Sequence, residues 1–406
     1  MEPVSLVIHQ VRKAMSDITQ EAVIIGGDFQ GLGIARNLSG LGVRVLVVDP
    51  VFCISKFSRH VDRVHRSPAY GNPEKFTDFL IGLSVQEKLQ KPVIFPTSDI
   101  AVRILAKSRT RLEEHYLVPT PAWEITRLAY NKKLTYQLAA EIGVPIPRTF
   151  FPESEEKLSE QVLDFPVILK PAITANFYPV THLKAIKAND HHELLRNYRY
   201  MSSIIDKTEI MVQEIIGGGP KNLYSFCSLF SNGTVKAKIM GVRLRQHPMD
   251  FGSSSTYVIT CNVPQLEELS AQILRKMNYY GLSEVEFMLD ERDNTYKLID
   301  INPRTWAWHT LGAKAGVNFS ALLFRDMHND SVQLDSFETG VTWIREVSDV
   351  PTALMEMVKQ RLNVIDYLRT LRGKKELAVF SRRDPLPFVA ELFWAPYMLC
   401  KRGFRM

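Results

Sequence analysis

The sequence predicts an α/β protein whose N-terminal part surrounds a parallel sheet and whose C-terminal part is α+β. Two observations carry this prediction. Short Val- and Ile-rich runs at 22–27, 43–48 and 93–97 alternate with helical patterns, and this alternation is typical of parallel strands joined by helices. Further along the chain, pairs of apolar runs are separated by short polar turns, as at Asn232-Gly233, which is typical of antiparallel hairpins.

Length and composition predict a folded globular protein. The chain has 406 residues, 45% of them hydrophobic, enough for one large core or two to three smaller ones. No run reaches the roughly 18 apolar residues that span a bilayer, and the first 20 residues predict an amphipathic helix rather than a signal peptide. The four cysteines show no metal-ligand spacing, so we expect reduced thiols and a cytoplasmic protein.

Most of the positive charge lies at the C-terminus. Residues 372–406 contain eight Lys and Arg against three Asp and Glu, which is +5 of the net +6. The nearly neutral remainder argues against a nucleic-acid partner. The apolar, aromatic and then basic segment 387–406 is too interrupted to span a membrane. We expect it to pack on the protein, and contact with an anionic membrane surface stays open as the alternative.

A glycine-rich turn, "GGDFQGLGIARNL", follows the first predicted strand. Its glycines, at 26, 27, 31 and 33, match neither the dinucleotide fingerprint nor a phosphate-binding P-loop. Asp49 lies at a suitable distance for a ribose contact, the one feature of a dinucleotide site that is present. We expect the glycines to allow close strand–helix packing or the approach of a small ligand at the strand ends, and Asp49 to end a strand.

Changes of pattern along the chain divide it into four parts. The Pro-rich "LVPTPAWE" at 117–124 marks the first boundary. We expect a parallel-sheet domain over 1–120, and a linker helix with a small α+β domain over 121–213. An antiparallel-sheet domain over 214–330 and a C-terminal extension over 331–406, mainly helical and ending in the basic, aromatic tail, complete the chain.

The segment "EVEFMLDERDNTYKLIDINPR", 284–304, carries the sharpest chemical pattern. Glu286 lies on one predicted strand, and Asp300 and Asn302 lie two residues apart on the next, hence on one face. Three oxygen donors on adjacent strands suit Mg²⁺. Glu284 alternates onto the face of Glu286, and two like charges there favour a bound cation. The alternative is an ordinary hairpin with polar residues facing solvent.

Cationic side chains follow a second pattern. Lys132 or Lys133 begins a helix and Lys170 ends an apolar strand, where an ammonium group among apolar neighbours favours a phosphate partner. Arg243 and Arg245 lie on one face of a strand and would repel each other unless an anion bridges them. Solvated side chains are the alternative for each pair. The glycine-rich bend after "VQEII" could present backbone groups to an adenine or simply join two domains.

Taken in this order, these segments resemble the ATP-grasp superfamily of carboxylate–amine ligases, from about residue 22 to 330. Segments such as "VIFPTSDIAV", "LKPAITANF" and "RLRQHPMDFG" are similar to its D-aspartate-ligase-like branch. The resemblance implies a Rossmann-like N-terminal domain, a small α+β lid and an antiparallel-sheet catalytic domain.

The resemblance also implies roles for single residues. Those implied to bind ATP are Lys132 and Lys170 at the phosphates, and Gln213, Glu214 and Ile216 at an adenine-binding hinge. Those implied to hold two Mg²⁺ ions, for which Mn²⁺ can substitute, are Glu286, Asp300 and Asn302. Arg243 and Arg304 would stabilise the transferring phosphoryl group and the acyl phosphate.

The chain departs from the family pattern at three places, one of which is Asp300, where relatives often have Glu; metal binding should tolerate this change. The lid loop 171–181 has no glycine, so Asn176 and Lys184 are candidates to contact the phosphates instead. No acid follows the hinge where relatives bind the ribose, and Asn222 is a weak substitute.

The implied reaction joins a small-molecule carboxylate to an amine, of an amino acid or a peptide or glycan precursor, through an acyl phosphate, with release of ADP and phosphate. Two alternatives remain: a carboxylase or carbamoyl-phosphate-type enzyme, and a non-catalytic ATP-binding module. A homodimer is left open.

Overall fold

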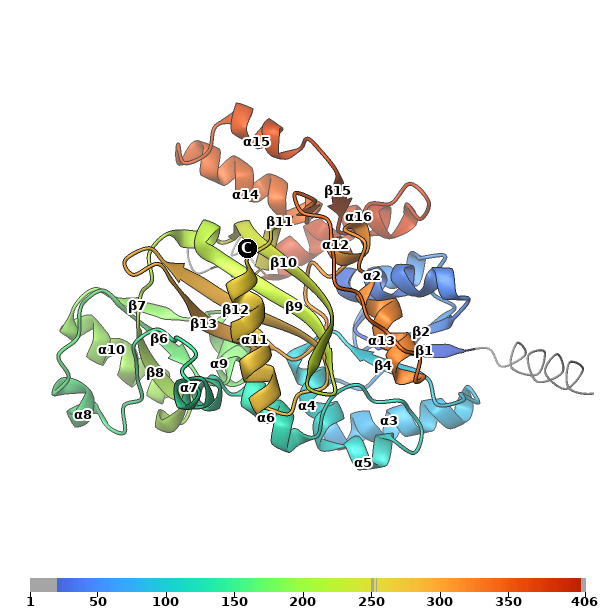
Figure 1. The fold of residues 1–406 in the computed structure, drawn as a ribbon, viewed down its shortest axis with the longest axis horizontal. Coiled ribbons are helices and arrows are strands. Elements are labelled where there is room, and N and C mark those ends of the chain that lie inside the picture. The colour runs from blue at the N-terminus through green and yellow to red at the C-terminus, as the bar shows by residue number, and fades with distance from the viewer. Residues whose placement is uncertain (1–19, 250–251, 253, 403–406) are drawn as a thin grey trace, which may run out of the picture.

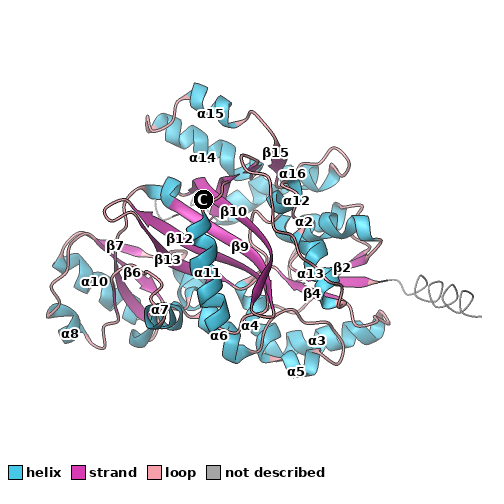
Figure 2. Cartoon of the chain, viewed as in Figure 1, coloured by secondary structure: helices cyan, strands magenta, loops and turns pink. Residues whose placement is uncertain are grey.

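The computed structural model describes residues 20–249, 252 and 254–402, with side-chain surroundings up to residue 394. The amphipathic helix predicted before the first strand lies outside the described residues. Three sheets organise this part of the chain: a parallel sheet, a small sheet at the opposite end of the molecule, and a large antiparallel sheet between them (Figures 1 and 2). The α/β prediction, with α+β in the C-terminal part, is confirmed.

The N-terminal sheet is parallel, with strand order β3-β2-β1-β4. The strands β1, β2 and β4 are mainly apolar and buried, as expected where helices cover both faces of a parallel sheet, whereas the edge strand β3 has the polar sequence RVHR and is partly exposed. Its elements are β1 (Glu21–Ile25), α2 (Phe29–Leu38), η1 (Ser39–Leu41), β2 (Arg44–Asp49), η2 (Ile54–Phe57), β3 (Arg63–Arg66), α3 (Pro73–Gln86), β4 (Val93–Pro96), α4 (Asp99–Lys107) and α5 (Arg109–Leu112). Ser98 caps α4 by accepting a hydrogen bond from the amide of Ala101 at 3.3 Å, and serine is among the residue types favoured at this position.

The small sheet, which we call the lid, is antiparallel with strand order β5-β8-β6-β7. Two helices, α6 (Trp123–Tyr130) and α7 (Lys132–Glu141), precede it. Its elements are β5 (Thr149–Phe150), α8 (Glu155–Ser159), β6 (Val167–Pro171), α9 (Thr174–Thr181), β7 (Ile186–Ala188), α10 (His191–Ser202), η3 (Lys207–Glu209) and β8 (Ile210–Glu214).

The large sheet has the order β13-β12-β9-β10-β11-β14-β15. Its elements are η4 (Gly219–Asn222), β9 (Leu223–Ser231), β10 (Thr234–His247), β11 (Ser254–Thr260), α11 (Pro264–Lys276), β12 (Gly281–Asp290), β13 (Thr295–Asn302), α12 (Thr310–Lys314), α13 (Phe319–Met327), β14 (Thr342–Ile344), α14 (Glu346–Val358), α15 (Val364–Thr370), β15 (Lys375–Leu377) and α16 (Leu386–Arg402). Asn232 and Gly233 turn the β9–β10 hairpin with positive φ angles of 51° and 74°, as predicted from their residue types.

One hydrophobic core joins segments far apart in the chain. It contains side chains of β1 and α2, of β9 and β10, and of β14, together with Trp306, Trp308 and Val379. The N-terminal sheet therefore packs directly against the large sheet and its C-terminal elements, without a core of its own on that side. We retain the boundaries near 120, 213 and 330 as a proposal about chain organisation.

The glycine-rich turn after β1 is packed tightly. A Cβ atom on Gly31 would lie 2.0 Å from the carbonyl oxygen of Gly26, and one on Gly27 would lie 2.4 Å from Sγ of Cys53. The carboxylate of Asp49 accepts hydrogen bonds from the amides of Gly27 at 2.7 Å and Val51 at 2.9 Å. These contacts favour the packing interpretation of the turn and give Asp49 a structural task at the end of β2.

Two local expectations were wrong. Residues 174–181 form the helix α9 rather than a loop, and Asn176 on it donates to both oxygens of Glu209, at 3.0 and 2.9 Å. The C-terminal extension also contains β14 and β15, which continue the large sheet. Both strands have only three residues, too few for an alternating pattern to be visible.

Candidate active site

The polar cluster of the predicted metal site lies on the edge pair of the large sheet, β12 and β13. The register places Glu284 opposite Asn302 and Glu286 opposite Asp300. The amide of Asn302 donates to Glu284 at 3.0 Å and reaches Glu286 at 3.5 Å. The structure thus brings together all three oxygen-bearing side chains that the sequence selected, on one face of two paired strands.

Two cations are paired with these carboxylates. Lys132, the first residue of α7, forms an ion pair with Asp300. Arg243 of β10 donates through Nη2 to Glu286 at 2.9 Å, and both side chains are largely buried. The cations therefore come from α7 and β10, and the carboxylates with which they pair come from the β12–β13 pair.

Arg304 connects this cluster to the N-terminal sheet. Its Nη2 lies 3.3 Å from Oδ1 of Asn302, and its Nε donates to Asp99 of α4 at 2.5 Å. Burial acts to raise the pKa of Asp99, but the positive charges of Arg304 and Lys132 outweigh it and lower that pKa. Sequence analysis missed Asp99. Its position after β4, at the carboxyl end of a parallel strand where ligands commonly bind, was the available signal.

Lys170 of β6 belongs to the lid side of the cluster. Its Nζ donates to Oε1 of Gln213 at 2.9 Å, and the amide of Gln213 donates to Thr149 at 2.9 Å. Burial and the nearby charge of Lys132 lower the pKa of Lys170 to about 8. A buried ammonium group in this state gains stability from an anion. The side chain of Gln213 thus connects Lys170 with Thr149, whereas the sequence predicted only that Gln213 lies at the hinge.

Lys184 lies between α9 and β7 and faces the same cluster. The residue is exposed to solvent. Desolvation lowers the pKa of Lys184, the charges of Glu286 and Asp300 act to raise it, and the lowering effect is the larger. The contact of Lys184 with phosphates stays a prediction, whereas Asn176 is held by Glu209.

The two arginines of β10 do not share a ligand, contrary to the expectation that an anion bridges them. The pairing with β11 shifts register between Arg243 and Arg245, and this β-bulge separates their side chains. Arg245 is buried in a bidentate pair with Asp349 of α14, with both distances 2.8 Å. The guanidinium also lies 4.2 Å from the ring centroid of Tyr257. Its role is to fix α14 on the sheet.

Glu284 is the most deeply buried carboxyl group of the cluster. It is 4% exposed and accepts a hydrogen bond from the indole of Trp308 at 3.0 Å. Burial and the adjacent charge of Glu286 raise its pKa. Two carboxyl groups so close together, Glu284 and Glu286, are stabilised by a bound cation.

Comparisons with known proteins show what the chain is similar to. A family model, the ATP-binding domain of the carbamoyl-phosphate synthase L chain, matches residues 255–324. A D-aspartate ligase of Enterococcus faecium is 22% identical over 324 residues, which cover 75% of this chain and 76% of that protein.

Solved structures share the fold. An L-amino acid ligase from Bacillus licheniformis has a TM-score of 0.59 and 16% identity, covering 76% of this chain and 74% of its own. The biotin carboxylase domain of Hydrogenobacter thermophilus 2-oxoglutarate carboxylase, solved with MgADP and bicarbonate, has a TM-score of 0.63 and 15% identity, covering 80% and 73%. The chain has the fold of ATP-grasp proteins.

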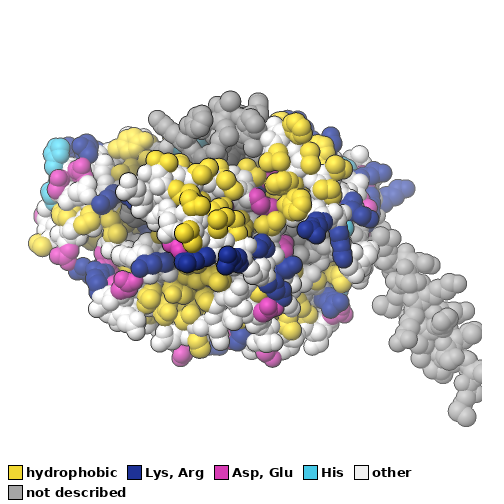
Figure 3. Space-filling model, turned by 90° about the horizontal axis from the view of Figure 1, so that it is seen from above, with side chains coloured by type: hydrophobic (Ala, Val, Ile, Leu, Met, Phe, Trp, Pro, Cys, Tyr) yellow, Lys and Arg dark blue, Asp and Glu magenta, His cyan; other side chains and the backbone are white. Residues whose placement is uncertain are grey.

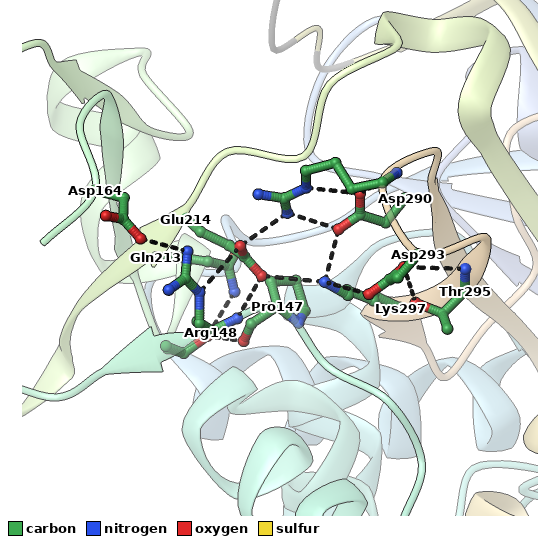
Figure 4. A network of polar contacts seen from close by, with 11 residues as sticks. Pro147, Arg148, Asp164, Gln213, Glu214, Asp290, Asp293, Thr295 and Lys297 are labelled. Carbon is green, nitrogen blue, oxygen red and sulfur yellow. Dashed lines mark hydrogen bonds and ion pairs between the residues drawn. The ribbon is translucent and has the colours of Figure 1, made fainter.

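In this ATP-grasp fold, the hinge predicted at Gln213 to Ile216 connects the lid to the large sheet. Glu214, the last residue of β8, accepts hydrogen bonds from the backbone and side chain of Arg148, from Arg292 and from Lys297 (Figure 4). Burial acts to raise the pKa of Glu214, but these donors lower it to about 2. Its amide donates to the carbonyl of Arg148 at 3.0 Å, so this backbone N–H, one of the groups expected to contact adenine, is already engaged. Ile216 follows, 9% exposed.

Asn222 is occupied elsewhere in the protein. Its amide donates to the carbonyl of Leu289 at 3.3 Å and to Glu291 at 2.9 Å, and the residue is 4% exposed. Asn222 thereby fixes η4 against the end of β12. Its contact with a ribose remains a proposal, and the bonds to Leu289 and Glu291 weaken it.

The cluster of side chains around Glu286 fits an anionic ligand with a divalent cation. Among described side chains, Nε of Arg243 is buried without a hydrogen-bond partner, as expected of a group that receives an acceptor from a ligand. The described residues contain no group of three His, Cys, Asp or Glu side chains arranged for a metal. Two carboxylates and one amide suit Mg²⁺, which keeps waters and takes phosphate oxygens.

Proposed function

We propose that this protein is an ATP-dependent carboxylate–amine ligase. The observation that carries the proposal is the cluster in which Lys132, Arg243 and Arg304 converge on Glu286, Asp300 and Asn302. Anion-binding and cation-binding side chains at one place are what a magnesium–nucleotide complex requires.

The residues divide into groups by the charge that they recognise. Glu286, Asp300 and Asn302 would hold Mg²⁺, two ions in our proposal with Mn²⁺ as a substitute. The metal supplies positive charge against the phosphate oxygens when bound. Lys132, Lys170 and Lys184 bind the phosphates from α7 and from the lid. Arg243 and Arg304 stabilise the negative charge that accumulates on the transferred phosphoryl group.

The reaction proceeds in two displacements. A carboxylate oxygen attacks the γ-phosphorus of ATP, the bond to the β-phosphate oxygen breaks, and ADP leaves. The amine then attacks the carbonyl carbon of the acyl phosphate, loses a proton and expels inorganic phosphate. The lid, which carries Lys170 and Lys184, excludes water that would hydrolyse the acyl phosphate.

At least one substrate is proposed to be an amino acid. The support is the similarity to a D-aspartate ligase across three quarters of both chains, and the shared fold of an L-amino acid ligase. Because its co-substrate is ATP, we place the enzyme in the cytoplasm. A carboxylase stays the second candidate, since biotin carboxylase domains have the same fold.

Isotope transfer tests the proposal directly. The protein is incubated with Mg-ATP, D- or L-amino acids and carboxylates labelled with ¹⁸O, and released phosphate is analysed by mass spectrometry. Transfer of one ¹⁸O from carboxylate to phosphate, dependent on an amine for turnover, is the expected result. Phosphate release that needs bicarbonate instead supports the carboxylase, and ATP binding without turnover supports a binding module.

A matched pair of variants controls this experiment. Asp300→Asn removes a proposed metal ligand and is expected to lower turnover at least ~100-fold. Asp335→Asn, on a loop outside the cluster, removes the same charge and is expected to leave turnover unchanged. Equal turnover in both variants would remove Asp300 from the catalytic site.

A further inference from the structure

Three C-terminal helices leave apolar side chains in solvent. On each helix these side chains recur at a spacing of about three to four residues. This spacing places them on one side of the helix, so each helix has one apolar outer face. The residues are Val350, Leu354, Met355, Val358, Val364, Ile365, Leu368, Leu386, Val389, Leu392 and Phe393. We call these the apolar end face. Val358 is 84% and Phe393 82% exposed.

Figure 3 looks down on this end of the molecule. Hydrophobic side chains gather there over α14, α15 and α16, and Lys and Arg side chains lie along the border. The face continues into residues 51–57, because Phe52 packs on Trp394 with ring centroids 4.2 Å apart and remains 38% exposed. A contiguous apolar area of this kind on a monomer marks an interaction site.

The acidic residues of this region point inward. Glu391, on the inner side of α16, pairs with Arg345, and Asp349 pairs with Arg245. Asp384 accepts from Arg36 at 2.9 Å and is 3% exposed. The helices thus bury carboxylates while exposing aliphatic and aromatic side chains, the reverse of an ordinary surface helix.

The exposed charges of the same region are almost all positive. Between residues 346 and 394, the side chain of Asp366 is half exposed and pairs with Arg369, and the buried Glu356 pairs with Lys359 and Arg361. Just before this range, the half-exposed Glu338 pairs with Lys374. The exposed cations are Lys359, Arg361, Arg369, Arg372, Lys374, Arg382 and Arg383. The face therefore combines apolar side chains with a positive border.

We propose that the apolar end face binds the surface of an anionic lipid bilayer. Apolar side chains that enter the headgroup region and cations that contact acidic headgroups are the two contributions that hold peripheral proteins. A second copy of this chain fits less well, because a two-fold interface would bring the positive borders together. No helix in the described part of the chain is long and apolar enough to cross a membrane, so the contact would be peripheral.

The sequence left two alternatives for the C-terminal segment, packing on the protein and contact with an anionic membrane surface. In this proposal they apply to opposite sides of α16. Its inner side packs on the protein through Glu391 and Phe388, and its outer side forms part of the apolar end face. Truncation before residue 387 would remove both at once, so point substitutions are the informative test.

Vesicle co-sedimentation of the full chain provides that test. Vesicles of phosphatidylcholine alone are compared with vesicles containing phosphatidylglycerol, at low and at physiological salt. Binding that increases with the anionic lipid fraction and weakens with salt is the expected result. Equal or negligible pelleting with both compositions would overturn the proposal.

Two variants and matched controls locate the binding surface. Leu392→Ser with Phe393→Ser, and Arg382→Gln with Arg383→Gln, should each weaken binding roughly 10-fold. Val162→Ser, 98% exposed on the lid, and Lys157→Gln with Arg196→Gln, also on the lid, should not. Thermal melting and Mg-ATP binding verify folding. If sedimentation velocity instead shows a dimer that Leu392→Ser with Phe393→Ser dissociates, and vesicles do not bind, the face joins two copies and the lipid proposal is wrong.

Discussion

Glu214 and Arg292 join the lid to the hairpin of the candidate metal site, with the guanidinium 2.8 Å from the carboxylate. Lys297 adds a second contact from β13 to the same carboxylate at 3.3 Å. Two residues of this strand, Asp300 and Asn302, are proposed to hold Mg²⁺. The position of the lid is therefore tied mechanically to the strand that carries these side chains.

Glu214→Gln should destabilise the protein at neutral pH, and this destabilisation should decrease as the pH is lowered. Because the pKa of Glu214 is lowered to about 2, its stabilising contribution is complete above the unfolded pKa of about 4.5 and disappears as the pH falls toward 2. We expect a loss of roughly 2 kcal/mol at pH 7 and, because pH 3 lies only about one unit above the folded-state pKa, less than half of that loss at pH 3. Urea unfolding at the two pH values measures both. Asp164→Asn, which removes an exposed partner of Arg148, should change stability by less than about 0.5 kcal/mol.

Lys170 should make ATP affinity depend on pH above neutrality. With a pKa of about 8, its ammonium is charged below that pH and becomes neutral as the pH rises through it, so phosphate binding weakens at alkaline pH. The KM for ATP is expected to rise about 10-fold between pH 7 and 9. In Lys170→Arg the guanidinium stays charged, so the rise should disappear. An unchanged profile in that variant would assign the pH dependence to another group.

Asp99→Asn should lower turnover more than nucleotide binding. Asp99 contacts Arg304 and none of the three proposed metal-binding residues directly, so it positions the guanidinium that faces Asn302. We expect kcat to fall roughly 10- to 100-fold while the KM for ATP changes less than about 3-fold. Asp99→Glu should recover part of the activity. A large change in the KM for ATP with kcat intact would contradict a positioning role.

Gly31→Ala should destabilise the protein before it affects any ligand. The added methyl would lie 2.0 Å from the carbonyl oxygen of Gly26, so α2 must move away from β1, at a cost of about 2–4 kcal/mol. The sequence left open whether these glycines allow close packing or the approach of a small ligand, and the contacts of Gly31 favour packing. Gly82→Ala in α3, where nothing lies within 4 Å of the new atom, is the matched control and should stabilise by about 0.5–1 kcal/mol. Equal melting temperatures would show that the turn can adapt.

The sequence predicted the parts of this fold that depend on local pattern. Apolar runs and a hairpin turn located the parallel strands and the β9–β10 turn, and alternation placed Glu286, Asp300 and Asn302 on one face. It did not reveal the bulge that separates Arg243 from Arg245, because one extra residue in a strand leaves no compositional trace. Asp99 escaped notice for another reason: its contact with Arg304 spans 205 positions and depends on how two sheets pack.

The shared core has a consequence for synthesis of the chain. Ile24 and Leu32 are buried in the same cluster as Trp343 and Val379. During synthesis, one apolar side of β1 and α2 therefore stays exposed to solvent until the last fifth of the chain has left the ribosome. Nascent chains halted before residue 341 should be the species that chaperones retain and proteases cut, and folding of the N-terminal sheet becomes one of the final events rather than the first.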